Sequence, residues 1–255
     1  MMKINIIFRL ITFSLILVSY SYSITRAEVK IIEASENIVY LSQKVAKNYL
    51  LYSLYNGKID KKDVLNSSLN ILSTNLRTIA MRTKDVSSKN ILEFLAYTKE
   101  QIEEVVKEKN TSESSALILD YTEALLEGAT SISNLYINKM SKEEEMLTIH
   151  NKLIYLLERI SKYYIALNDG FNDETNQEQM QISIDNFETY LVQINQYKYP
   201  YNLKKDISGI NKSWKKTKLF FTKLDKIFIP ILFLNSTSYI GDSLSKLSLY
   251  HNQNQ

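Results

Sequence analysis

Four basic residues, arranged as two pairs with the same spacing, are the strongest candidates for ligand binding in this chain. The first pair is Lys44 and Lys47, and the second is Arg159 and Lys162. Residues three apart lie on one face of an α-helix, so each pair presents two cations that can bind a carboxylate or a small oxyanion. The alternative is an ordinary solvent-exposed basic face. With two polar neighbours added, the predicted ligand-binding residues are Ser42, Gln43, Lys44, Lys47, Arg159 and Lys162.

Residues suited to catalysis or metal binding are scarce. The chain has no cysteine and only two histidines, His150 and His251, which excludes disulfides, thiolate zinc sites and cysteine nucleophiles. The acids at 143–145 lie near His150, but a di-iron bundle needs Glu-x-x-His and position 147 is leucine. A glycine-rich phosphate loop is also absent from the sequence. We therefore predict a non-enzymatic protein with no catalytic residue, metal or cofactor.

The pattern at the N-terminus indicates export. Basic residues precede an apolar run from Leu10 to Val18, and small residues follow, which is typical of a secretory signal peptide at residues 1–27. Two cleavage sites fit this pattern, one at 21–23 and one at 25–27. We expect a periplasmic or extracellular protein. The alternative is an uncleaved signal that acts as an N-terminal membrane anchor.

The distribution of charge argues against a nucleic-acid partner. The formal net charge is +3, but residues 1–27 contain three basic and no acidic residues, so the remainder is balanced. The segment from Lys198 to Lys226 is rich in lysine and contains aromatic residues, a composition that suits an anionic lipid, a glycan or a nucleic acid. We interpret it as a helix with exposed lysines and buried aromatics, because lysine readily keeps its amine in water above an apolar surface.

The segments that carry the basic pairs repeat after 115 residues. Residues 40–49 align without a gap with residues 155–164, and apolar residues farther along align at the same offset, for example Leu72 with Phe187. A period of this length indicates a duplicated domain and not a solenoid of short repeats.

Hydrophobic spacing of three and four residues predicts four helices in each half. Five glycines and two prolines also favour long helices over a sandwich or barrel. We predict an all-α fold of two tandem up-down four-helix bundles after the signal peptide, at 28–140 and 141–255, with a nearly continuous helix through residue 140 as one way of joining them. The predicted helices span about 28–55, 61–81, 88–109, 113–139, 141–168, 176–196, 203–222 and 229–250.

The first-helix segment YLSQKVAKNYLL, at residues 40–51, resembles a known family. It is similar to the first helix of the PilJ-type domain of type IV pili methyl-accepting chemotaxis transducers, and to the nitrate-sensing bundle of NarX-like kinases. The resemblance implies a sensor-like bundle in which an arginine binds a small anion at a dimer interface. The residues that match the family pattern are Leu41, Ser42, Gln43, Val45, Ala46 and Lys47, weakly echoed by Leu156, Arg159, Ile160 and Lys162.

The family arginine is replaced by Val39, and its counterpart in the second half is Ile154. Without a guanidinium the bidentate recognition of nitrate is lost, so nitrate sensing does not carry over. We expect a module that binds a small-molecule or anionic ligand, or a membrane sensor protein, outside the cytoplasm; a homodimer is compatible with this. The alternative is a structural or adhesion spacer protein of the cell envelope. A sensor needs a polar pocket near the basic pairs, whereas a spacer is packed solid there.

Overall fold

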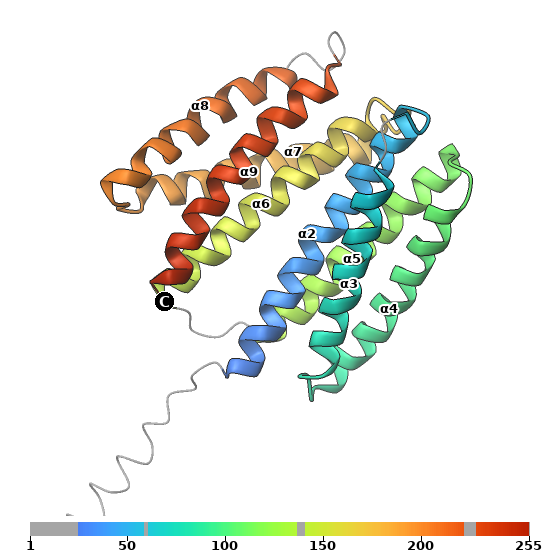
Figure 1. Ribbon diagram of the computed structural model, residues 1–255, viewed down its shortest axis with the longest axis horizontal. Helices are drawn as coiled ribbons and strands as arrows, with labels where there is room; N and C mark the ends of the chain where they lie inside the picture. Colours follow the sequence, from blue (N-terminus) through green and yellow to red (C-terminus); the bar gives the residue numbers. More distant parts are fainter. Residues whose placement is uncertain (1–24, 59–60, 137–140, 222–227, 255) are drawn as a thin grey trace, which may run out of the picture.

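The computed structural model of the protein describes residues 25–58, 61–136, 141–221 and 228–254. The regular secondary structure of these residues is entirely helical, which confirms the predicted all-α class (Figure 1). Within the part of the chain that the structure describes, no helix is both long enough and apolar enough to span a membrane. The elements are α2 (Arg26–Leu54), α3 (Lys62–Ala80), α4 (Val86–Lys107), α5 (Ser112–Tyr136), α6 (Lys142–Ala166), α7 (Glu174–Gln196), η1 (Tyr201–Leu203), α8 (Lys204–Phe221) and α9 (Pro230–Gln253).

The helices end close to the predicted positions because the turn residues act as the sequence suggests. After α2, Asn56 and Gly57 adopt positive φ angles of 48° and 74°. Asparagine and glycine tolerate this left-handed backbone best, so the Asn-Gly pair stops the helix. Gly170, with φ of 98°, lies in the turn that follows α6. The predicted continuous helix through residue 140 concerns residues 137–140, which lie outside the described residues.

Polar caps begin α2 and α6. The Thr25 hydroxyl accepts a hydrogen bond from the backbone amide of Glu28 at 3.2 Å, and the Glu28 carboxylate accepts one from the amide of Thr25 at 2.7 Å. Ser141 and Glu144 make the same pair of bonds at 3.2 and 2.6 Å. Each cap gives a partner to two amides that the helix itself leaves unpaired. Residues 1–24 of the predicted signal peptide lie outside the described residues.

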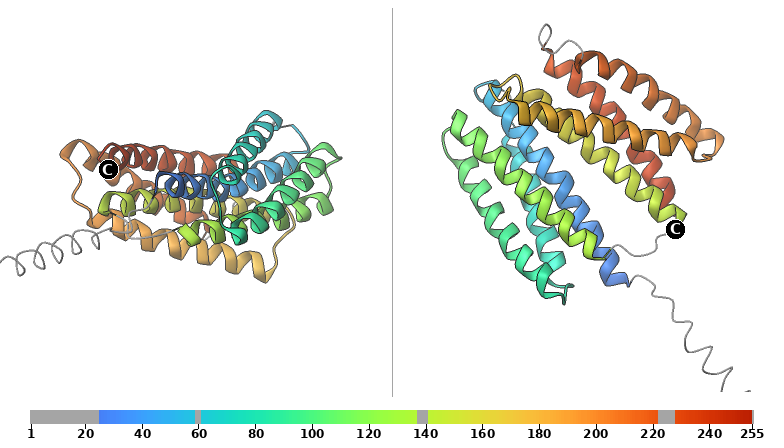
Figure 2. Two further views of the ribbon diagram at one scale, coloured as in Figure 1. Left: turned by 90° about the horizontal axis from the view of Figure 1, so that it is seen from below. Right: turned by 180° about the vertical axis from the view of Figure 1, so that it is seen from behind.

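The helices pack as two groups that meet where α2 contacts α6. In the first group, α2 and α4 each pack against α3 and α5. In the second group, α6 packs against α7 and α9, and α8 packs against α9. Figure 1 shows the groups on either side of the α2–α6 contact, with α4 and α8 outermost, and Figure 2 shows the same grouping from two further directions.

Two clusters of buried apolar side chains hold these groups together. One cluster is built only from α2 to α5. The other is built from the second group, but it also includes Leu50 and Leu51 of α2 and Leu119 of α5. These three leucines continue the second core across the α2–α6 contact. The two groups therefore share apolar surface, and the removal of that surface from water stabilises their association.

The residues related by the 115-residue offset occupy corresponding buried positions in the two groups. Val45 of α2 and Ile160 of α6 are both fully buried, and so are Leu72 of α3 and Phe187 of α7. The helical period explains this agreement, because a residue-for-residue match keeps the same side chains on the core-facing stripe. Further buried pairs at this offset are Leu41 and Leu156, Leu69 and Ile184, Leu76 and Leu191, and Ile79 and Ile194.

Candidate functional site

All six predicted ligand-binding residues lie on α2 and α6, the helices through which the two groups meet. The residues at positions 42, 43, 159 and 162 are buried, whereas Lys44 and Lys47 are partly exposed. Ser42 makes its hydrogen bonds within α2, because its hydroxyl donates to the Val39 carbonyl at 2.8 Å and accepts from Gln43 at 3.0 Å. The two basic pairs therefore have different surroundings and are best considered separately.

Arg159 and Lys162 do hold a carboxylate, but it belongs to the protein itself. Arg159 Nη1 lies 2.8 and 2.7 Å from the two carboxylate oxygens of Glu123 on α5, and Lys162 Nζ donates to one of the same oxygens. Arg159 Nη2 donates to Gln179 Oε1 of α7 at 2.8 Å, and Nη1 lies 3.5 Å from Gln43 Oε1 of α2. These five residues, called the Glu123 cluster below, connect four helices from both groups.

The cluster carries more positive than negative charge in a buried place. Lys162 is fully buried, and this burial, together with the charge of Arg159 and against the opposing effect of Glu123, lowers its pKa to about 7. Burial alone would raise the pKa of Glu123, but the two cations lower it overall. Tyr163 places its ring 4.0 Å from Lys162 Nζ and 5.2 Å from the Arg159 guanidinium, which compensates part of the lost hydration.

The lysines of α2 border an open groove between α2, α6 and α9, called the lysine groove below. Lys47 Nζ lies 2.5 Å from Glu158 Oε2 of α6, so this lysine is paired across the contact. Lys44 Nζ lies 5.4 Å from the centre of the Tyr40 ring and forms no ion pair with a described residue. The groove has a volume of about 300 Å³ and is lined by Tyr40, Lys44, Lys47, Ile154, Leu157, Glu158, Ser161, Leu234, Thr237, Ser238, Gly241, Asp242 and Ser245.

The walls of the lysine groove carry both signs of charge. Lys44 stands on the α2 wall and Asp242 on the α9 wall, and neither is ion-paired within the described part of the chain. The hydroxyls of Thr237, Ser238 and Ser245 lie on the same α9 wall. A groove of this size is at the lower end of the range for small-molecule sites. Its lining can bind a small polar molecule that has a carboxylate at one end and an ammonium group at the other.

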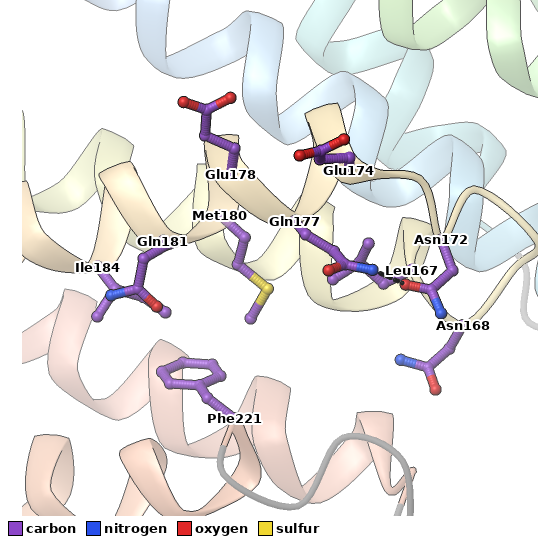
Figure 3. Close-up of a pocket in the computed structure, with 10 residues that line it drawn as sticks. All are labelled: Leu167, Asn168, Asn172, Glu174, Gln177, Glu178, Met180, Gln181, Ile184 and Phe221. Atoms are coloured by element: carbon purple, nitrogen blue, oxygen red, sulfur yellow. Dashed lines mark hydrogen bonds between the residues drawn. The ribbon is translucent and has the colours of Figure 1, made fainter.

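A larger hollow, of about 840 Å³, lies between the start of α7 and the end of α8 (Figure 3). Met180 and Phe221 face each other across it, whereas Glu174 and Glu178 point away from Phe221. No basic side chain is among the described residues that line this hollow, and it contains none of the predicted ligand-binding residues. It is therefore a weaker candidate site than the lysine groove.

Four residues that matter for these sites are not predicted from the sequence: Glu123, Gln179, Glu158 and Asp242. Glu123 is one of several acids on α5, and no local pattern distinguishes it from its neighbours. Gln179 of α7 is equally inconspicuous. The repeat does point to Glu158, because the 115-residue offset aligns it with Gln43, a predicted ligand-binding residue. The α6 side of the contact thus places an acid beside its basic pair, where α2 has an amide.

Comparison of the chain with protein-family models, with curated proteins and with solved structures gives no match. Among the described residues, no group of three or more histidine, aspartate or glutamate side chains is placed to hold a metal ion. The function must therefore be inferred from the lysine groove and the Glu123 cluster themselves.

The charge balance of the Glu123 cluster predicts unequal effects of two substitutions. Glu123→Gln leaves two buried cations without a counterion, so we expect the free energy of unfolding to fall by about 3–5 kcal/mol. Lys162→Met leaves the Arg159–Glu123 pair intact, so we expect a change of less than about 1 kcal/mol at neutral pH. Denaturant unfolding of both single variants and of the double variant measures these terms.

A matched control is Glu188→Gln, which removes the carboxylate of an exposed pair with Lys218 and should cost less than about 1 kcal/mol. Equal losses for Glu123→Gln and Glu188→Gln would contradict the assignment of the Glu123 cluster as a buried, water-excluded pairing. So would a failure of Lys162→Met to reduce the cost of Glu123→Gln in the double variant.

The lowered pKa of Lys162 predicts a specific pH dependence. Above about pH 7 the folded protein releases the lysine proton, while the unfolded chain keeps it up to the ordinary value of 10.5. Because the unfolded state then binds more protons, stability rises with pH across this window, by at most about 1.4 kcal/mol per pH unit. We therefore expect the unfolding free energy of the native protein to rise relative to that of Lys162→Met from about pH 7 to 9.5. A difference that is independent of pH would contradict the shift.

Proposed function

We propose that this protein is an exported, non-enzymatic helical module that binds a small zwitterionic ligand in the lysine groove. The observation that carries the proposal is that Lys44 and Asp242 lie on opposite walls of one groove. Neither has an ion-pair partner among the described residues. A free amino acid or a similar molecule presents a carboxylate and an ammonium group that match these two charges. The Ser238 hydroxyl can donate or accept a further hydrogen bond, whereas the hydroxyls of Thr237 and Ser245 donate to backbone carbonyls of α9 and can only accept.

Ligand binding in this groove can change how the two groups of helices are arranged. The groove is bordered by α2 from the first group and by α6 and α9 from the second. A ligand that bridges Lys44 and Asp242 favours arrangements in which α2 and α9 lie close together. Such a ligand changes the balance between two arrangements only by binding one of them better, and small helix shifts at interfaces are a common result. A partner receptor that contacts α2 and α9 can then distinguish the bound from the free protein.

The domain organisation that we propose with this function is two tandem up-down four-helix bundles, derived by duplication and related to the PilJ-type domain. The 115-residue offset supports the duplication, since paired residues are buried at corresponding positions of the two groups. The match of residues 40–51 to the first helix of that family supports the relationship. The α2–α6 contact would then be the counterpart, within one chain, of the dimer interface that the family resemblance implies.

The second candidate function is a spacer or adhesion protein of the cell envelope. One observation favours it: both cations of the second basic pair already hold a carboxylate of the protein itself, that of Glu123. The spacer hypothesis explains the Glu123 cluster as a means of joining the two groups rigidly. It does not explain why Lys44 and Asp242 lie in an open groove without partners.

If the protein is exported, the cap of α2 predicts the residue at which the mature chain begins. Cleavage at residues 25–27 would remove Thr25 and with it the cap of α2, which is worth about 1 kcal/mol. Cleavage after Ser23 leaves this cap in place, so we expect the mature chain to begin at Ile24. The intact mass of the protein recovered from outside the cytoplasm measures this. Recovery of the uncleaved chain in the membrane fraction would instead support the N-terminal anchor.

A thermal-shift screen of the purified protein tests the ligand. The panel should contain amino acids, carboxylates without an amine, amines without a carboxylate, and neutral polyols. Binding to the folded state alone stabilises it by about 2.7 kcal/mol at a ligand concentration one hundred times Kd. We expect amino acids to raise the melting temperature more than either single-charge class does.

The variants Lys44→Ala and Asp242→Ala should each abolish that rise, whereas Lys216→Ala, which removes an exposed lysine of α8 away from the groove, should preserve it. If no compound in the panel raises the melting temperature, the ligand proposal is wrong and the spacer function is favoured. A rise that survives Lys44→Ala would place the ligand at another site.

A further inference from the structure

A second buried polar network lies where α6 begins and α9 ends. It contains both histidines of the chain, His150 of α6 and His251 of α9, which the sequence alone gave no reason to connect. Both side chains are fully buried, and their ring centres are 5.0 Å apart. Tyr199, in the connection between α7 and α8, places its hydroxyl 3.2 Å from His150 Nε2 and 2.8 Å from His251 Nε2.

The ends of this network fix the protons on two ring nitrogens. His150 Nδ1 lies 2.6 Å from the carbonyl oxygen of Met146, which can only accept, so Nδ1 carries a proton. His251 Nδ1 lies 2.5 Å from Oε2 of Glu143. The other oxygen of this carboxylate accepts a hydrogen bond from the Tyr197 hydroxyl at 2.6 Å. The Tyr197 and His251 contacts lower the pKa of Glu143, so this carboxylate is ionised and His251 Nδ1 is also a donor.

The middle of the network then lacks one proton if both histidines are neutral. With Nδ1 protonated on each ring, both Nε2 atoms are acceptors, and the single hydroxyl proton of Tyr199 can satisfy only one of them. One added proton completes the chain: one histidine donates to the Tyr199 oxygen, and Tyr199 donates to the other. His251 faces the Glu143 carboxylate, whereas His150 faces only a carbonyl and a hydroxyl, so His150 is the neutral member. Burial, with a smaller contribution from His251 and against the Met146 hydrogen bond, lowers the pKa of His150 to about 4, which agrees with this. The added proton therefore belongs on His251, beside Glu143.

We propose that this network is a proton-binding site: it holds His251 as a buried imidazolium between Glu143 and Tyr199, and release of this proton frees the end of α9 from the start of α6. With the proton gone, two acceptor nitrogens face one hydroxyl, so one buried nitrogen is left without a donor and the contact between α6 and α9 is weakened. The titratable or charged groups around His251 are Glu143, His150, Tyr197, Tyr199 and Tyr250, with Lys142 over the Tyr197 ring.

The first group contains a similar connection, in which a tyrosine stands in place of the histidine. The 115-residue offset aligns His251 with Tyr136, at the end of α5. The Tyr136 hydroxyl lies 2.5 Å from that of Thr83 and 3.2 Å from that of Ser88, so it too ties the last helix of its group to the connection between the second and third. These partners are neutral hydroxyls. The proton dependence should therefore be confined to the α6–α9 group, and this inference is independent of any ligand in the lysine groove.

The protonation states can be read directly, because the chain has only two histidines. The purified protein, without a histidine tag and with ¹⁵N-labelled histidine, is examined by long-range ¹H–¹⁵N correlation at about pH 7.5, one unit above the ordinary histidine pKa. His150→Gln assigns the signals. We expect one histidine, His251, with both nitrogens protonated, and one neutral histidine protonated on Nδ1. Two neutral histidines under these conditions would overturn the proposal.

Hydrogen exchange tests the structural consequence. As the pH is raised until the His251 signals change to the neutral form, amide exchange in residues 247–253 and 142–146 should accelerate, after correction for the intrinsic pH dependence of exchange. Exchange at the end of α5 should show no such change. If the His251 signals change and exchange at the end of α9 does not, the proton does not hold α9 to α6 and the proposal fails.

Tyr199→Phe provides a test that does not rely on titrating the native protein. Without the hydroxyl, the second donor of His251 has no acceptor, so we expect His251 to lose its proton at a lower pH than in the native protein. Tyr239→Phe, at an exposed tyrosine of α9, is the matched control and should leave both histidines unchanged. An unchanged titration of His251 in Tyr199→Phe would show that the hydroxyl does not hold the proton in place.

Discussion

Glu123 places its carboxylate between two cations of another helix, and one of these cations, Lys162, is fully buried. Burying Lys162 and Arg159 without a counterion would cost several kcal/mol for each. The meeting of the two helical groups therefore depends on this one acid. Apolar contact has little directional preference, whereas a carboxylate of α5 that must lie within hydrogen-bond reach of two cations of α6 restricts how the two groups can be aligned.

The two polar networks serve different parts of the molecule. The Glu123 cluster joins the groups to each other, whereas the histidine network joins the start of α6 to the end of α9 within the second group. In both places the charged members are surrounded by apolar or aromatic side chains, so a missing partner is costly and the arrangement is specific. The lysine groove differs from both networks, because its charged side chains are near water and Lys44 forms no ion pair with a described residue.

The sequence predicts the helices well and the chemistry only in part. Core positions such as Val45 and Ile160 follow from helical periodicity, and Asn56-Gly57 marks a stop by its backbone preference. The two basic pairs were also located on the correct helices. Glu123 and the meeting of His150 with His251 were not predictable, because each depends on contacts between helices far apart in the chain. Local spacing describes one helix face and contains no information about which side chain another helix brings to it.

Having α2 and α6 in one polypeptide frees their contact from symmetry. In a dimer of identical chains, each substitution appears on both sides of a two-fold interface at once. Here Gln43 faces the contact from one side and its counterpart Glu158 from the other, and the same is true of Lys44 and Arg159. The covalent link also replaces association between separate molecules by an intramolecular contact at a high effective concentration. The two sides of the contact can therefore differ: the basic pair on α6 holds Glu123, whereas Lys44 of α2 borders an open groove.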